Sequence, residues 1–323
     1  MPEFEGEHQG DSYIFFGAQV AETKGTIISG TTLPGAINDS KFGVFGFREN
    51  GDHIFDRYKT DDGYPFDNVA NVYRIGEGDQ QPFKYDLLSL WHSGQHTFYG
   101  FFPWDADKTV ITSAGLDNTS RPYISYAQPV SLEAMKDVMT GSKQATKEGG
   151  DVVIPMVHRL FSFYVKLNNN QEDSQREITV KSATVNFYDV ASKAELYFDG
   201  TMEVGTGVIQ PSHVFTMDQV TLAYGSSQEF NKNGTTPNPF LFLPCTSLKV
   251  KVSFTIVNAW GEEITLTPSG ASEEDQTITL APTDGFQAGY KYILNINKTD
   301  KDITFEASLQ DWDPVVDIPI DFN

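Results

Sequence analysis

Two histidines four residues apart are the first candidates for chemistry. His92 and His96 have the spacing with which a helix turns two imidazoles toward one metal ion. The residues between them, Ser93-Gly94-Gln95, favour a turn, and a turn gives the pair no fixed common face. The remaining histidines lack a second ligand beside them in the sequence: His8, His53, His158 and His213. We therefore expect no metal site, and a structural, half-buried place for His158.

Carboxylates are the second candidates. Five aspartates crowd one stretch: Asp52, Asp56, Asp61, Asp62 and Asp67. A calcium loop would alternate its ligands and close with a glutamate, which this stretch lacks, so a solvated loop is the better interpretation. Among 44 acidic residues no pair is marked as a glycosidase pair, and neither a nucleophile elbow nor a phosphate-binding glycine loop is present. The sequence predicts a protein that is not an enzyme and needs no cofactor.

Aromatic side chains offer a third kind of site. Flat rings suit the apolar faces of sugars, and a platform could combine Trp91, Trp104 and Trp260 with the tyrosines around Tyr123 and Tyr126. Such a platform would make the protein a carbohydrate-binding surface module that does not polymerise. The same rings also suit a protein core or an interface, and the sequence leaves both interpretations open.

Composition excludes several classes of partner. The formal net charge is −21, whereas nucleic acids and anionic membranes require clustered lysine and arginine. Cys245 is the one cysteine, so neither an internal disulfide nor a cysteine metal cage can form. No apolar run reaches the 18 residues of a transmembrane helix. The first residues lack the features of a signal peptide, so we expect either a cytosolic protein or a chain that starts after a removed signal.

Alternating apolar and polar residues predict strands throughout the chain. The chain contains 27 glycines, 16 prolines and 13% aromatic residues, which favours a β-rich protein. We expect strands over 97–102 and 160–167, and strand pairs 248–256 with 263–267 and 290–297 with 303–309. One short helix is expected, with Ser131 as its N-cap and Gly141 at its C-terminal cap.

The glycine-rich stretch 141–150 marks the best boundary between two domains. We place an N-terminal domain at 1–153 and a C-terminal domain at 154–323. Two antiparallel β-sandwiches in series is the all-β architecture that follows.

The end of the chain is the most informative stretch of the sequence. One face of the strand 315–323 is apolar, formed by Val316, Ile318, Ile320 and Phe322. Chain ends lose order unless they are docked. A terminal strand this apolar therefore needs a groove, either in its own subunit or in a neighbouring one.

Five short motifs follow one another along the chain: Lys41 to Phe47, His96 to Pro103, Asp137-Val138-Met139 with Ser142-Lys143, Met156 to Phe163, and Ala288 to Tyr292 followed by Trp312. In this order they resemble motifs of the fimbrillin-like proteins, a family of pilins and adhesins of Bacteroidetes-type bacteria.

The resemblance implies two transthyretin-like, Greek-key β-sandwiches in a pilus subunit or surface adhesin without catalytic activity. It also implies export as a lipoprotein precursor to the outer membrane, where the fimbrium mediates cell adhesion. The implied partners are other subunits, in a homo- or heteropolymer, and surface glycans or proteins of the host or of bacteria.

The resemblance further implies assembly by terminal strands. In polymerising members a trypsin-like protease removes an N-terminal strand, here Tyr13, Ile14, Phe15 and Phe16, and Lys24 is the first basic residue after it. The donor strand of the next subunit, here Val316 to Phe322, then fills the groove. Pro319 lacks an N–H and would lose one ladder bond in an inserted strand. The alternative, an edge strand that closes the C-terminal domain's own sheet, stays open.

Overall fold

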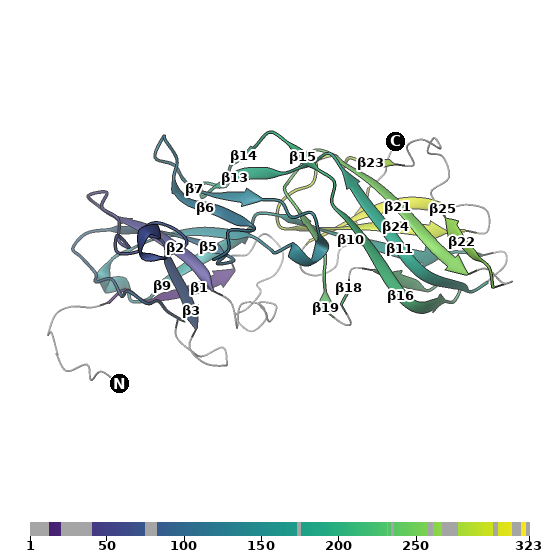
Figure 1. Cartoon of the computed structure of the whole chain (residues 1–323), viewed down its shortest axis with the longest axis horizontal. Coiled ribbons are helices and arrows are strands. Elements are labelled where there is room, and N and C mark those ends of the chain that lie inside the picture. Colours follow the sequence, from purple (N-terminus) through teal and green to yellow (C-terminus); the bar gives the residue numbers. More distant parts are fainter. Residues whose placement is uncertain are drawn as a thin grey trace.

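The computed structural model describes residues 13–20, 41–74, 83–172, 176–230, 232–233, 236–257, 261–266, 277–299, 303–311 and 318–320. Strands dominate these residues, and the helices among them are three short 3-10 helices: Thr60–Asp62, Leu132–Ala134 and Lys147–Gly149. The strands form two lobes arranged end to end (Figure 1). The all-β prediction is confirmed.

Lobe one contains a seven-stranded and a four-stranded sheet. The seven-stranded sheet has the order β1-β9-β8-β5-β2-β3-β4, with bounds β1 (Phe16–Val20), β2 (Phe42–Arg48), β3 (Ala70–Arg74), β4 (Phe83–Lys84), β5 (His96–Phe102), β8 (Met139–Ala145) and β9 (Val152–His158). The four-stranded sheet has the order β14-β13-β7-β6, with β6 (Ile111–Leu116), β7 (Pro122–Ala127), β13 (Lys193–Tyr197) and β14 (Met202–Val204).

The seven-stranded sheet of lobe one is covered on both faces, because alternate residues of a strand point to opposite sides. Phe101 of β5 belongs to a core cluster that it shares with Ile124 and Leu196 of the four-stranded sheet. Phe98 of the same strand belongs to a second cluster, which includes Phe55 from the connection between β2 and β3. The four-stranded sheet therefore covers one face, and connecting segments cover the other.

Lobe two is a sandwich of two sheets. One sheet has the order β17-β10-β24-β25-β26, with β20 also paired to β10, and the other has the order β16-β11-β21-β22, with β23 also paired to β21. The first contains β10 (Phe161–Asn169), β17 (Ser227–Glu229), β20 (Phe240–Phe242), β24 (Tyr290–Lys298), β25 (Ile303–Asp311) and β26 (Ile318–Ile320). The second contains β11 (Ile178–Tyr188), β16 (Ser212–Leu222), β21 (Leu248–Val257), β22 (Glu263–Leu266) and β23 (Ile278–Leu280). A separate small ribbon joins β18 (Lys232–Asn233) and β19 (Thr236–Pro237).

The predicted strand pairs of lobe two are confirmed. β21 pairs antiparallel with β22, and β24 pairs antiparallel with β25. Val250, Val252 and Phe254 of β21 are buried between the sheets, as the alternation predicts. Two pairings depart from the antiparallel rule, since β1 runs parallel to β9 and β10 runs parallel to β24.

The predicted helix between residues 131 and 141 is wrong. The segment forms one 3-10 turn over Leu132–Ala134, and Ser131 makes no side-chain cap. Met139 and Gly141 lie in β8 instead, where they pair with Phe102 and Gly100 of β5. The helix prediction rested on three apolar residues at helical spacing, Leu132, Met135 and Met139. They were too few to outweigh sheet pairing, because tertiary contacts override a weak local preference.

The chain interleaves the two lobes. It leaves lobe one after β9 and enters lobe two with β10, but residues 190–209 return to lobe one as a long hairpin that includes β13 and β14 (Figure 1). We call residues 190–209 the arm. β9 spans the expected domain boundary between residues 153 and 154, and the arm adds strands from the expected second domain to lobe one. As a statement about independent folding units, the division into 1–153 and 154–323 stays a prediction.

His158 and Arg159, at and just after the end of β9, make polar contacts where the chain leaves lobe one. Nδ1 of His158 lies 2.6 Å from Oδ2 of Asp137. Burial lowers the pKa of His158, but the charge of Asp137 and the hydrogen bond to it outweigh burial, so that the pKa is raised. The guanidinium of Arg159 donates to the backbone oxygens of Tyr197, Gly200 and Thr201 at the tip of the arm, at 3.1, 3.1 and 2.8 Å.

The close approach of β8 and β9 requires a glycine. A Cβ on Gly141 would lie 2.0 Å from the carbonyl oxygen of Pro155, a backbone atom that cannot move away alone. We expect Gly141→Ala to cost about 1–3 kcal/mol of unfolding free energy, measured by denaturant unfolding. Gly149→Ala is the matched control, because a Cβ there meets nothing within 4 Å. Equal stability of the two variants would contradict this account.

The His158–Asp137 pair predicts a pH-dependent stability. A histidine whose folded pKa is raised stabilises the fold below its unfolded pKa of about 6.5, and this contribution is lost as the pH rises through the folded value. We expect Asp137→Asn to be less stable than the parent at pH 6, and the difference to shrink toward pH 9, in thermal unfolding. Glu133→Gln, at the more exposed pair with His213, is the control. A difference that grows with pH would exclude the pair as the cause.

Candidate assembly interface

The first described strand occupies an edge of the seven-stranded sheet. β1 pairs with β9 alone, in parallel register from Phe16 opposite Val152 to Val20 opposite Met156. Ahead of the strand, the amide of Ile14 donates to the carbonyl oxygen of Ser89 at 2.9 Å, and Phe15 accepts from the amide of Val152 at 2.8 Å. Because only one side of β1 is paired, its removal would break one ladder and leave the rest of the sheet intact.

Two side chains attach the N-terminal segment to the core. Ile14 and Phe16 are 0% and 3% exposed, whereas Tyr13 and Phe15 are 45% and 38% exposed. The ring centroid of Phe16 lies 5.4 Å from that of Phe98 and 5.6 Å from that of Tyr85. Burial of two such side chains contributes about 1.5–3 kcal/mol each. We call the apolar surface beneath Ile14 and Phe16 the β1 seat.

A buried tyrosine adds a polar contact to the β1 seat. The hydroxyl of Tyr85 donates to the carbonyl oxygen of Ile14 at 2.8 Å and accepts from the amide of Ser89 at 3.1 Å. Burial raises the pKa of Tyr85 to about 12, so the hydroxyl keeps its proton and remains a donor. Loss of the N-terminal segment would remove the shorter bond of this buried donor and leave it only the carbonyl oxygen of Ser89 at 3.5 Å, which favours a replacement strand.

The last described strand occupies an edge in lobe two. β26 pairs antiparallel with β25, with Ile318 opposite Leu309, Pro319 opposite Ser308 and Ile320 opposite Ala307. An edge strand tolerates proline when the missing N–H faces away from the neighbour. In this subunit the backbone of β26 thus belongs to its own lobe.

Several predicted assembly residues lie outside the described residues. Lys24, Val316 and Phe322 fall there, and so do the side chains of Ile318 and Ile320. The roles of the predicted donor strand and of the processing site therefore stay predictions. Tyr13, Ile14, Phe15 and Phe16 are described, and they alternate between exposed and buried as a strand with one apolar face.

The histidine pair does not form a site among the described residues. His96 is fully buried on β5, and its Nδ1 donates to the carbonyl oxygen of Gly94 at 3.2 Å. Burial lowers the pKa of His96, which favours the neutral ring stacked with Phe98. His92 is exposed on the preceding loop. Within the described part of the chain, no three histidine, cysteine or acidic side chains gather as a metal site would need.

The aromatic residues considered as a sugar platform do not share a surface. Trp91 packs against the core cluster of Phe98, and Trp104 packs against the cluster of Phe101, on the opposite face of the sheet. Tyr126 is buried, and Trp260 lies outside the described residues. Among the described residues, these rings therefore do not form a common platform.

Two of the aspartates between residues 52 and 67 make hydrogen bonds within their own loop. Oδ1 of Asp67 accepts from the amide of Thr60 at 2.7 Å, and this bond lowers the pKa of Asp67. Asp52 accepts from the side-chain amide of Asn50 at 2.8 Å. These contacts close turns.

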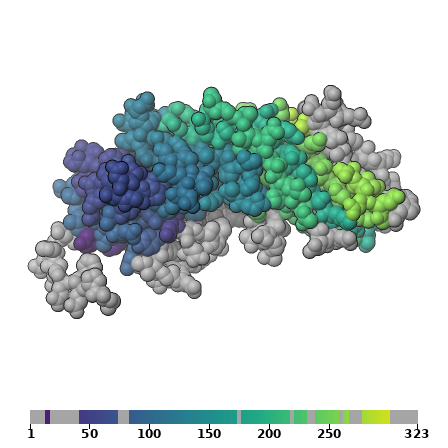
Figure 2. Space-filling view, viewed as in Figure 1, coloured from purple at the N-terminus to yellow at the C-terminus, as the bar shows by residue number. Residues whose placement is uncertain are grey.

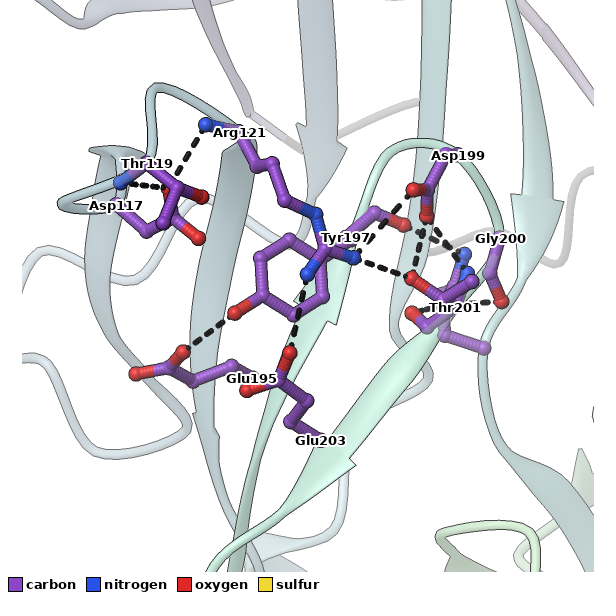
Figure 3. A network of polar contacts seen from close by, with 10 residues as sticks. Asp117, Thr119, Arg121, Glu195, Tyr197, Asp199, Gly200, Thr201 and Glu203 are labelled. Carbon is purple, nitrogen blue, oxygen red and sulfur yellow. Dashed lines mark hydrogen bonds and ion pairs between the residues drawn. The ribbon is translucent and has the colours of Figure 1, made fainter.

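Sequence reasoning missed a polar network on the four-stranded sheet (Figure 3). The guanidinium of Arg121 lies 3.5 Å from the ring centroid of Tyr197 and donates to Thr201 Oγ1 and Glu203 Oε1, at 2.7 and 3.0 Å. Tyr197 donates to Oε2 of Glu195 at 2.9 Å. Residues 117–121 and 195–203 are far apart in the sequence, and no spacing pattern marks them.

No helix in the described parts of the chain has the length and apolar character needed to cross a bilayer.

A family model described as fimbrillin-like matches residues 32–312 of the chain. Among solved structures, the chain is similar to a fimbrial protein from Bacteroides vulgatus ATCC 8482, with a TM-score of 0.60 and 16% identity over 93% of this chain and 99% of that one. It is also similar to a candidate cell adhesion protein from Parabacteroides distasonis ATCC 8503, with a TM-score of 0.55 and 12% identity over 94% of this chain and 97% of that one.

At these identities the structural likeness shows the fold alone. No curated protein matches the sequence. Because the family model spans most of the chain, from residue 32 to residue 312, this protein belongs to the fimbrillin-like family.

Proposed function

We propose that the protein is a fimbrial subunit or adhesin of the cell surface, without catalytic activity, that assembles with other subunits through its terminal strands. Family membership supports the class of function. The name of the similar fimbrial protein from Bacteroides vulgatus supports the same class. In this proposal the chain is exported as a lipoprotein precursor to the outer membrane, and its partners are copies of itself, other subunits, and surface glycans or proteins.

The position and packing of β1 carry the proposal. The strand lies at a sheet edge, and its attachment depends on Ile14 and Phe16, which occupy the β1 seat. The apolar face of the C-terminal segment has the same spacing of two, with Ile318 and Ile320 followed by Phe322. Removal of β1 would expose an unpaired strand edge and an aromatic groove together, which is what β-augmentation requires.

In the proposed mechanism, cleavage at Lys24 releases the N-terminal segment, and the C-terminal strand of the next subunit takes its place. The donor leaves the edge of β25 and exchanges one edge pairing for another, so the ladder bonds largely cancel. The apolar side chains that enter the β1 seat then supply the net gain. Pro319 removes one ladder bond in either place, so it does not favour one pairing over the other.

The first test is assembly after limited trypsin digestion, followed on gels without boiling. We expect a cut at Lys24 and a ladder of polymers from the full chain, and no ladder from the Ile318→Asp, Ile320→Asp variant, because two charges cannot enter an apolar groove. Asp317→Asn with Asp321→Asn changes the polar face of the same strand and should polymerise normally. Unchanged polymers of the Ile318→Asp, Ile320→Asp variant would sink the donor role.

The same variant also tests the alternative in which the tail only closes its own lobe. In that case the two aspartates should lower the unfolding free energy of the uncut monomer by several kcal/mol through buried charge, and no trypsin-dependent ladder should form from the parent chain. The melting midpoint of the uncut monomer provides this measurement.

A second prediction concerns the anchor of β1. Phe16→Ala empties an aromatic pocket and should weaken β1 by about 3–5 kcal/mol, so that the cleaved N-terminal peptide leaves the body faster in size-exclusion chromatography. Phe15→Ala is the matched control on the exposed side of the same segment. Equal release from both variants would show that the β1 seat does not hold the strand.

A further inference from the structure

The arm is a continuous β-hairpin that projects from lobe two. At its base β12 (Val190–Ala191) pairs with β15 (Val208–Ile209). The ladder continues through the amide of Ser192, which donates to Gly207 O at 3.1 Å, and the amide of Gly205, which donates to Lys193 O at 3.0 Å. It ends in β13 and β14, with Ala194 opposite Val204 and Leu196 opposite Met202. The arm thus holds its own shape through internal pairing.

On lobe one the arm packs against a strand edge and an apolar surface beneath it. We call this edge and surface the seat of the arm. β13 pairs with β7 over five residues, from Lys193 opposite Ala127 to Tyr197 opposite Tyr123. Leu196 is fully buried there. The ring of Phe198 lies 5.4 Å from Phe45 and 5.2 Å from Tyr99, which belong to the seven-stranded sheet. Figure 2 shows the green surface of the arm along the upper side of lobe one, beside the blue surface of β6 and β7.

Two arginines of lobe one recognise the tip of the arm. Arg159, 6% exposed, donates to three backbone oxygens of the turn between β13 and β14. Arg121 covers the ring of Tyr197 and binds Thr201 and Glu203 (Figure 3). These contacts depend on the conformation of a hairpin turn, so the seat selects this arm over an arbitrary strand.

The base of the arm provides a hinge. Thr206 and Gly207 are exposed, and Gly207 has a φ of 113°, a conformation that glycine adopts without strain. Ser192 faces Gly207 across the hairpin, so bending of both strands at these two residues would swing residues 193–205 away from lobe one as a unit, since the ladder beyond them is internal. The vacated seat would then present the edge of β7 and the two arginines to any other arm.

We propose that the seat on lobe one accepts the arm of a second copy of this chain, so that two subunits exchange arms reciprocally. Every contact of the arm with its seat is made equally well in the exchanged pair, so exchange costs association entropy and hinge rearrangement without loss of packing. Reciprocal exchange closes on a two-fold axis and adds no further subunits. It therefore differs from strand exchange at the chain ends, which leaves free ends for growth.

Net charge sets the conditions for exchange. Each chain has a formal charge of −21, so two subunits repel one another in dilute salt. Salt screens this repulsion over about 10 Å at 0.1 M. The exchanged dimer should therefore increase with ionic strength as well as with protein concentration.

A disulfide across the seat tests the proposal in the full chain. Ser125 of β7 and Glu195 of β13 are direct partners in the sheet, within the range that a disulfide spans. The variant carries Ser125→Cys, Glu195→Cys and Cys245→Ser. It is unfolded under reducing conditions and refolded at a series of concentrations. The samples are then oxidised and run on non-reducing gels. We expect a covalent dimer whose ratio to the monomer rises about tenfold for a tenfold rise in concentration while the monomer predominates.

The matched control places a disulfide between strands that both lie in lobe two. Thr184 of β11 and Ser253 of β21 are also direct partners, so Thr184→Cys with Ser253→Cys should give intrachain links at every concentration. Covalent dimers from this pair in equal amount would mark random cross-linking and overturn the proposal. Intrachain links alone from the Ser125, Glu195 pair at every concentration would also overturn it.

A second measurement uses no cysteine variant, so it tests the proposal even if the introduced cysteines prevent folding. Two differently tagged preparations of the unsubstituted chain are unfolded together, refolded at high concentration and high salt, and captured through one tag. We expect the second tag to be recovered. Recovery should fall in the Arg121→Ala, Arg159→Ala variant and stay unchanged in the Ile318→Asp, Ile320→Asp variant. Absence of the second tag would overturn arm exchange and would leave assembly through the chain ends untouched.

Discussion

The placement of the arm on lobe one depends on the hydrogen bonds that the buried guanidinium of Arg159 donates. It follows β9, where the chain leaves lobe one, and it binds the turn at which the arm reaches lobe one again. Burial lowers the pKa of this group, but arginine remains charged in proteins, so the carbonyl oxygens of the turn must replace the lost water. A neutral side chain would deprive the carbonyl oxygens of Gly200 and Thr201 of this donor, whereas that of Tyr197 would keep the amide of Gly200. One residue thereby ties the exit of the chain to its return.

A shared hydrophobic core also connects the two lobes. One cluster of buried side chains includes Phe101 of lobe one, Leu196 of the arm and Phe163 of lobe two. The lobes therefore share a core and are joined by more than a flexible linker. Since interiors are closely packed and poorly compressible, force applied at one end is passed to the other through packed side chains. This rigidity would suit the proposed assembly, in which a subunit joins its neighbours through opposite ends.

Edge strands set the other constraint. β1 covers an edge in lobe one, and β26 covers an edge in lobe two. An unpaired edge attracts further strands, so a protein that assembles through strands must keep its edges covered until assembly begins. The two terminal strands provide such covers at separate sheets, and the arm provides a third at β7. Of the two proposed assemblies, exchange at the chain ends would be open and exchange of the arm would be closed, and they would use different seats.

The sequence alone determined the β-rich class, the hairpins of lobe two and the family resemblance. These follow from alternation with period two and from turn residues, which are local properties. It gave a wrong helix near residue 135, because short 3.6-residue patterns compete poorly with sheet pairing. It also could not find the arm, the seat or the network of Arg121, Tyr197 and Glu203, since their partners are brought together only by the return of residues 190–209 to lobe one. Local pattern decides which segments become strands, but long-range packing decides which edges meet, and only the tertiary structure contains that choice.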